Sequence, residues 1–204
     1  MLASKQRFDN SILRVKNAYD LFKHLTEDKH FSPEHLSDIL RSIIVFCVSA
    51  LDRYIHDIIK VGIIEIYQGK RPTTQAYLKF KIPLSHFNNL SSQYPYEYYL
   101  SNYITEINSY KSFQEPGRIK EALNLIWDEP HKWQKIANNM RVSENDLKIK
   151  LNNIVIRRNQ IAHEADINLQ TGNLEFINLQ YAQTVINFIE KLVDSIDCEM
   201  NKST

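Results

Sequence analysis

The chain has too few cysteines, glycines and prolines for several common classes of protein. Two cysteines among 204 residues exclude a disulfide framework. Cys47 lies within an apolar run, so we expect a buried thiol, in keeping with a reducing cytoplasm. Four glycines and six prolines are too few for a fold rich in strands and tight turns. The four scattered glycines also exclude a glycine loop that cradles phosphate.

Long apolar runs and a strong charge bias are absent too. No run of roughly 18 apolar residues without a charge occurs, so we expect no transmembrane helix. Residues 1–7 lack the apolar core of a signal peptide, and we expect a cytoplasmic protein without a membrane partner. The formal net charge is only +1, so any binding of nucleic acid depends on a local basic patch.

The sequence motifs of metal sites and common hydrolases are missing as well. His24, His30 and His35 are not spaced as metal ligands, and no His-Glu-x-x-His sequence occurs. There is neither a nucleophile elbow nor a carboxylate cluster suited to two metal ions. The sequence therefore predicts no metal site and no cofactor.

What the sequence does contain is helical periodicity. Apolar residues recur at intervals of three and four in four long segments, 5–27, 33–68, 143–163 and 177–198. Ser32 and Pro33 predict the start of the second helix, and Gly62 predicts a kink or break in it. Residues 43–51 are apolar almost all round, so this helix should run through the middle of the protein. We predict an all-α fold, a bundle of long antiparallel helices in a single domain over residues 1–204.

Residues 70–140 are predicted to form a helical insertion in that domain. Five prolines divide them into short helices, because proline breaks a helix interior but suits its first turn. The firmest of these predicted helices cover 116–127 and 130–140. Lys79 and Lys81 begin a basic segment that precedes a tyrosine-rich one, a combination that can bind single-stranded RNA. The alternative is that these aromatic residues only pack the insertion against the bundle.

Arg158 interrupts the apolar stripe of the third long helix. Leu147, Leu151, Ile154 and Val155 mark the buried face of a helix that begins with a capping residue at Ser143, and Arg158 falls next on that face. An arginine there is costly unless it meets an anion or a partner surface. His163 follows five residues later, roughly 140° away around a straight helix. The two side chains can converge only through arginine's reach, a loosened helix end or a second copy of the chain.

This stretch resembles a known family. Arg158, Asn159, three further residues and His163 match the motif of the HEPN superfamily, and 158–166 and 43–57 are similar to its RiboL-PSP-HEPN branch. The resemblance implies a helical, metal-independent ribonuclease whose site is shared across a homodimer. It assigns proton transfer to His163, phosphate stabilisation to Arg158 and a polar supporting role to Asn159. Arg157 and Glu164 are neighbours without an assigned role. The alternative is that Arg158 and His163 are a structural polar pair.

Asp52 and His56 are the other candidate site residues. They lie one turn apart on the polar stripe of the second helix. We expect them to face the 158–163 motif, where a carboxylate can hold Arg158 or orient His163. The alternative is that this stripe is simply the wetter face of a long helix.

The resemblance thus implies cleavage of RNA by a homodimer, a reaction for which RNA carries its own nucleophile, the 2′-hydroxyl. The resemblance further implies a toxin or phage-defence role, with an antitoxin or regulatory partner. Two alternatives stay open: a non-catalytic helical module that binds RNA, a nucleotide or a partner protein, and a purely structural dimerisation domain.

Overall fold

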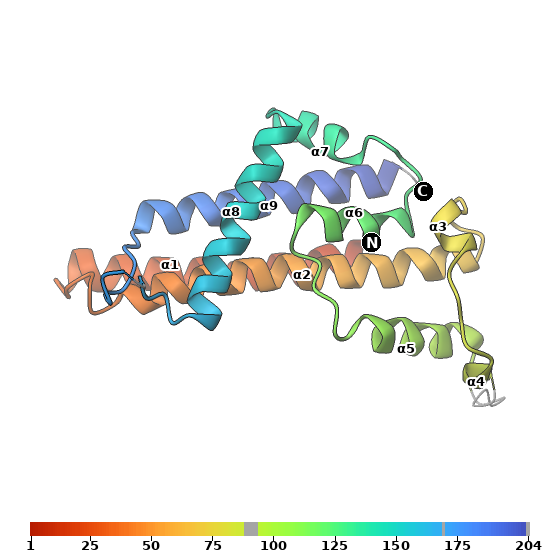
Figure 1. Ribbon diagram of the computed structural model, residues 1–204, viewed down its shortest axis with the longest axis horizontal. Helices are drawn as coiled ribbons and strands as arrows, with labels where there is room; N and C mark the ends of the chain where they lie inside the picture. The colour runs from red at the N-terminus through yellow and green to blue at the C-terminus, as the bar shows by residue number, and fades with distance from the viewer. Residues whose placement is uncertain (88–93, 169, 203–204) are drawn as a thin grey trace.

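The protein is predominantly helical in the part that its computed structural model describes, residues 1–87, 94–168 and 170–202 (Figure 1). Four long helices dominate this part: α1 (Leu2–Lys23), α2 (Ser37–Tyr67), α8 (Glu144–His163) and α9 (Leu179–Lys202). Within the same ranges, the only β-type pairing is an isolated bridge between Ile167 and Leu174. The predicted all-α fold is confirmed. α1 runs opposite to α2 and α9, whereas α8 crosses α2 and α9 instead of lying alongside them (Figure 1).

α2 runs through the middle of the protein, as its sequence predicted. It packs against α1, α5, α6, α8 and α9. Its largest fully buried side chains are Tyr54, Leu40, Ile43, Ile44, Leu51, Ile55, Ile58, Ile59 and Ile63. Cys47 is buried in the same helix, and desolvation raises the pKa of its thiol to about 12. Such a thiol stays protonated and packs as a small apolar side chain.

The start of α2 differs from the prediction by four residues. Residues 33–36 form a turn, and the helix begins at Ser37. The Ser37 hydroxyl donates to the Glu34 carbonyl at 2.8 Å and accepts from Arg41 Nη1 at 2.8 Å. These local hydrogen bonds stabilise the helix start at Ser37, although Ser32–Pro33 has the stronger sequence signal for a start at residue 33.

Gly62 does not kink or break α2, which is continuous from Ser37 to Tyr67. A Cβ atom at Gly62 would lie 2.6 Å from Cγ2 of Ile126, closer than side chains tolerate. The glycine therefore lets the chain just after α6 (Pro116–Asn124) approach the α2 backbone. The predicted kink is wrong, because Gly62 allows Ile126 to pack closely against α2 and does not bend the helix.

The chain between α2 and α8 contains shorter helices. Besides α6, they are α3 (Gln75–Leu78), α4 (Leu84–Phe87), α5 (Tyr96–Asn108) and α7 (Lys132–Met140). Pro95 precedes α5 and Pro116 begins α6, which agrees with the predicted effect of the prolines. α3 and α4 lie near the C-terminal end of α2, while α6 and α7 lie on the side of α9 (Figure 1). None of the helices in the described ranges is long and apolar enough to cross a membrane.

Replacing Gly62 with alanine should destabilise the fold. The added methyl forces Ile126 away from α2, and overpacking of this kind costs about 1–3 kcal/mol of unfolding free energy. The change in unfolding free energy can be measured by urea unfolding followed by circular dichroism. Gly117→Ala in α6 is the matched control, since a Cβ atom at Gly117 would have nothing within 4 Å. Equal stability of the two variants would contradict this role for Gly62.

Candidate functional site

α8 positions the Arg158–His163 motif. The Ser143 hydroxyl accepts the Asp146 backbone N–H at 3.0 Å and caps the helix, as predicted. The predicted buried face is also observed, with Leu147, Leu151, Ile154 and Val155 all buried. The helix stays regular through its last residue, His163. Its end is therefore not loosened in the way that would bring the two motif side chains together.

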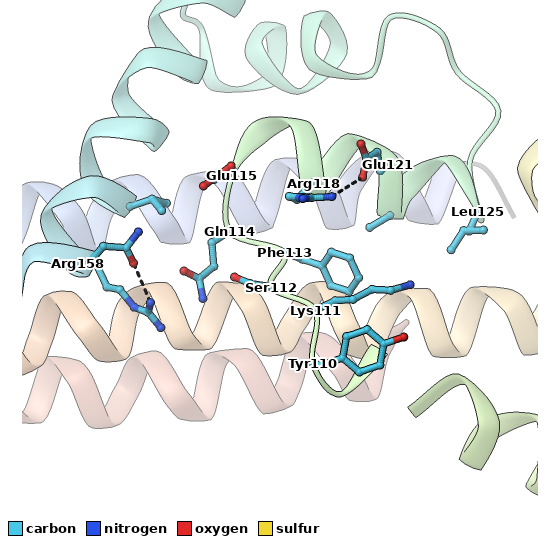
Figure 2. A pocket seen from close by; sticks show the side chains of 13 residues that line it. Tyr110, Lys111, Ser112, Phe113, Gln114, Glu115, Arg118, Glu121, Leu125 and Arg158 are labelled. Carbon is cyan, nitrogen blue, oxygen red and sulfur yellow. Dashed lines mark hydrogen bonds and ion pairs between the residues drawn. The ribbon is translucent and has the colours of Figure 1, made fainter. Parts of the chain in front are cut away.

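Arg158 is half-buried and has an unused hydrogen-bond donor. Its Nη1 donates to Asn159 Oδ1 at 2.9 Å (Figure 2). Its Nε is buried and finds no acceptor in the part of the chain that the structure describes. A buried donor without a partner costs about 1–3 kcal/mol. Because arginine cannot lose its charge, an anion or a partner chain at this position would relieve that cost.

His163 is exposed at the end of α8, and its ring makes no hydrogen bond or ion pair with residues 1–87, 94–168 and 170–202. It lies one turn beyond Asn159 on the same face of the helix. In a regular helix, Arg158 and His163 point roughly 140° apart. One chain therefore presents a cation and an imidazole that diverge from each other.

A cavity of about 550 Å³ lies beside Arg158. Its lining residues are Tyr110, Lys111, Ser112, Phe113, Gln114, Glu115, Arg118, Glu121, Ala122, Leu125, Val155, Arg158 and Asn159. Figure 2 shows it extending along α2, from Arg158 at one end to Tyr110 at the other. Its size falls within the range of about 300–1,000 Å³ that is typical of small-ligand sites.

Asp52 and His56 contribute to this cavity indirectly. Asp52 accepts the Phe113 backbone N–H at 2.6 Å and the Gln114 amide at 3.3 Å. His56 Nε2 lies 3.2 Å from the Lys111 carbonyl oxygen, and its ring packs on Phe113. The expected direct contact with the 158–163 motif is not observed, because the buried N–H of Phe113 takes the carboxylate. Both residues instead fix the segment that forms the cavity wall.

Lys79, Lys81 and Glu164 are not brought to Arg158 by contacts that the structure shows. Both lysines are exposed near α3 and α4, at the far end of α2 from the C-terminal part of α8 (Figure 1). Residues 88–93 of the predicted basic and aromatic segment lie outside the described residues. Glu164 directly follows α8 and is exposed. Within the described ranges, no cluster of three or more potential metal ligands occurs.

Arg157 has a structural partner, the buried carboxylate of Asp166. Arg157 Nη1 and Nη2 lie 2.5 and 2.8 Å from its two oxygens. Arg41 of α2 donates to the same carboxylate through Nε at 2.7 Å. Arg41 also donates to the Glu175 carbonyl at 2.7 Å, which ties in the chain that leads to α9. Two arginines from crossing helices therefore share one carboxylate that is only 1% exposed.

This arrangement also holds a strained chain reversal directly after His163. Ala165 and Asp166 have φ angles of 52° and 57°, in the left-handed region that non-glycine residues seldom adopt. The Asp166 backbone N–H donates to the Gln160 carbonyl at 3.1 Å, so the turn folds back on the last turn of α8. Sequence reasoning missed Arg41 and Asp166 as a pair. The only sequence signal was an arginine within the apolar α2 and an aspartate three residues after His163.

Asp166→Asn should strongly destabilise the protein. The amide keeps the shape of the side chain but removes the negative charge that both arginines share. We expect the unfolding free energy to fall by about 3–5 kcal/mol. Chemical denaturation would measure the loss. Asp38→Asn is the control, since Asp38 also pairs with Arg41 but is 88% exposed, and its loss should cost at most about 1 kcal/mol. Similar losses in the two variants would rule out a special role for the Asp166 carboxylate.

Comparison with known proteins agrees with the resemblance of the sequence to the HEPN superfamily. The family model described as RiboL-PSP-HEPN matches residues 9–202, nearly the whole chain. No curated protein and no solved structure matches the chain. Family membership suggests a nuclease-like or RNA-related role. With its helical fold and its Arg158–His163 motif at the end of α8, the chain belongs to the RiboL-PSP-HEPN family of the HEPN superfamily.

Proposed function

We propose that the protein is a metal-independent endoribonuclease whose active site is completed by a second copy of the chain. The observation that carries this proposal is the state of the motif in one chain. Arg158 has a buried Nε without an acceptor among the described residues, and His163 is exposed and diverges from it. A phosphate would give Arg158 an acceptor. His163 of the same chain points away from that phosphate, so we propose that His163 of a second copy reaches it.

The chemistry follows from the substrate. The RNA 2′-oxygen attacks the adjacent phosphorus, the bond to the 5′-oxygen breaks, and a 2′,3′-cyclic phosphate forms. The 2′-hydroxyl proton must leave and the 5′-oxygen must receive one. His163 suits either transfer because an imidazole titrates near neutral pH. One histidine performs one transfer at a time, so two chains supply the base and the acid.

Arg158 and Asn159 act on the phosphate in this proposal. The forked guanidinium donors match the phosphate oxygens and stabilise the charge that grows in the transition state. The Asn159 side chain holds one arm of the fork through its 2.9 Å hydrogen bond. That hydrogen bond leaves Nη2 of Arg158, which has no partner among the described residues, for the substrate. Asn159 is thus a positioning residue for the guanidinium.

The biological role that we propose is that of a toxin or phage-defence effector, controlled by an antitoxin or other regulatory partner. Its support is the family alone. A non-catalytic module that binds RNA, a nucleotide or a partner protein is the alternative outcome. Such a module would bind RNA and gain thermal stability from it without releasing products.

Substitutions in the motif test the chemistry. His163→Ala should lower the rate of RNA cleavage by about 10²–10⁴-fold, and Arg158→Ala should be comparably damaging. Arg158→Lys should restore little activity, because an ammonium lacks the fork. His35→Ala is the control, an exposed histidine in the turn before α2. Cleavage should persist in EDTA and leave a cyclic phosphate. EDTA-sensitive cleavage that both alanine variants retain in full would refute the assignment.

Mixing two inactive variants tests the shared site. Light scattering should give about twice the 24.0 kDa mass of one chain. After subunit exchange, an Arg158→Ala chain paired with a His163→Ala chain brings one intact arginine and one intact histidine from different chains to the shared site, so part of the lost activity should return even though the second histidine is missing. Each variant alone, taken through the same exchange, is the control. A wild-type monomer that cleaves RNA at micromolar concentration would contradict the composite site.

A further inference from the structure

The segment between α5 and α6 is held along α2 by hydrogen bonds and by buried side chains. We call residues 109–115 the α5–α6 linker. Asp52 accepts the Phe113 N–H at 2.6 Å, and His56 contacts the Lys111 carbonyl at 3.2 Å. Phe113 and Gln114 are buried at 6% and 5% exposure. Two side chains of α2 and two buried side chains of the linker thus fix an otherwise irregular segment.

The same contacts turn the preceding residues outward. Tyr110 is 80% exposed, and Lys111 is also exposed (Figure 2). The Lys111 ammonium makes no ion pair within the described ranges, whereas Arg118 on the opposite wall pairs with Glu121 at 3.4 Å. An exposed ring beside an unpaired cation has the chemistry that binds single-stranded nucleic acid, in which the base stacks and the phosphate meets the charge.

The linker is continuous with the proposed active site. It lines the same cavity as Arg158 and Asn159, and Figure 2 shows Ser112, Lys111 and Tyr110 following one another along α2 away from Arg158. Glu115 lies on the α6 side of the cavity in that view, where its charge would repel phosphates. Phosphates are therefore favoured on the Lys111 side.

We propose that the α5–α6 linker binds the single-stranded RNA next to the cleaved bond, with Lys111 on a phosphate and Tyr110 stacked on a base. The proposal rests on the proposed function, because Arg158 then defines the position of the cleaved phosphate. Asp52 and His56 are positioning residues in this arrangement. The enzyme would select unpaired RNA, since a base within a duplex cannot stack on Tyr110.

Binding measured without turnover tests this proposal. The His163→Ala protein would be titrated into a fluorescent single-stranded oligoribonucleotide of mixed sequence, and anisotropy recorded at several salt concentrations. Adding Tyr110→Ala should weaken binding by roughly 5- to 150-fold, while Tyr110→Phe, which keeps the ring, should bind normally. Adding Lys111→Ala should reduce the slope of log affinity against log salt by about 0.7. Lys120→Ala, an exposed lysine of α6 outside the cavity, is the charge-matched control.

The outcomes separate this inference from the proposed function. If the His163→Ala protein binds RNA and the Tyr110→Ala and Lys111→Ala additions change nothing, the linker proposal is wrong whether or not the wild type cleaves RNA. The same holds if a duplex of equal length binds as tightly as the single strand. If the wild type never cleaves RNA but the linker variants weaken binding as expected, the ribonuclease assignment fails and the linker remains an RNA-binding surface.

Discussion

The buried carboxylate of Asp166 is the contact on which the site depends. It receives Arg41 from α2 and Arg157 from α8, and Arg41 also holds the Glu175 carbonyl. The carboxylate therefore joins two crossing helices to the chain that leads into α9. The carboxylate is almost fully buried. Removing its charge would leave both arginines without their anionic partner and would strongly lower the unfolding free energy. The left-handed turn at Ala165 and Asp166 is kept by these contacts, and that turn leaves His163 as the last residue of α8.

Arg157 and Arg158 are neighbours on α8 but have different surroundings, because successive helix residues point about 100° apart. Arg157 turns toward Asp166 and pairs with its carboxylate, whereas Arg158 lines the cavity and its buried Nε has no acceptor among the described residues. Arg157 stabilises the framework, and we propose that Arg158 binds the phosphate of the substrate. The spacing also explains why His163, on the flank shared with Asn159, does not meet Arg158 within one regular helix. We therefore propose that a second chain completes a site that uses both groups on one phosphate.

α2 organises the rest of the cavity. Asp52 and His56 hold the α5–α6 linker, and Gly62 lets Ile126 and the adjoining α6 approach closely. One wall is fixed by hydrogen bonds and the other by packing. The central helix thus sets the position of both walls relative to Arg158, although none of its own residues lines the cavity. Asp52 and His56, which the sequence predicted to hold Arg158 or orient His163, instead fix the linker that forms one wall of the cavity.

The sequence by itself determined the helical class, the central position of α2, the capped start of α8 and the motif at its end. Each depends on spacing along one helix or on local capping chemistry, which neighbouring residues specify. Tertiary structure alone decided that Asp52 binds Phe113 and not Arg158, that Gly62 admits Ile126, and that Arg157 shares Asp166 with Arg41. These contacts join residues from different helices. No local pattern encodes them, because a buried polar group takes whichever partner the packing of the helices brings within reach.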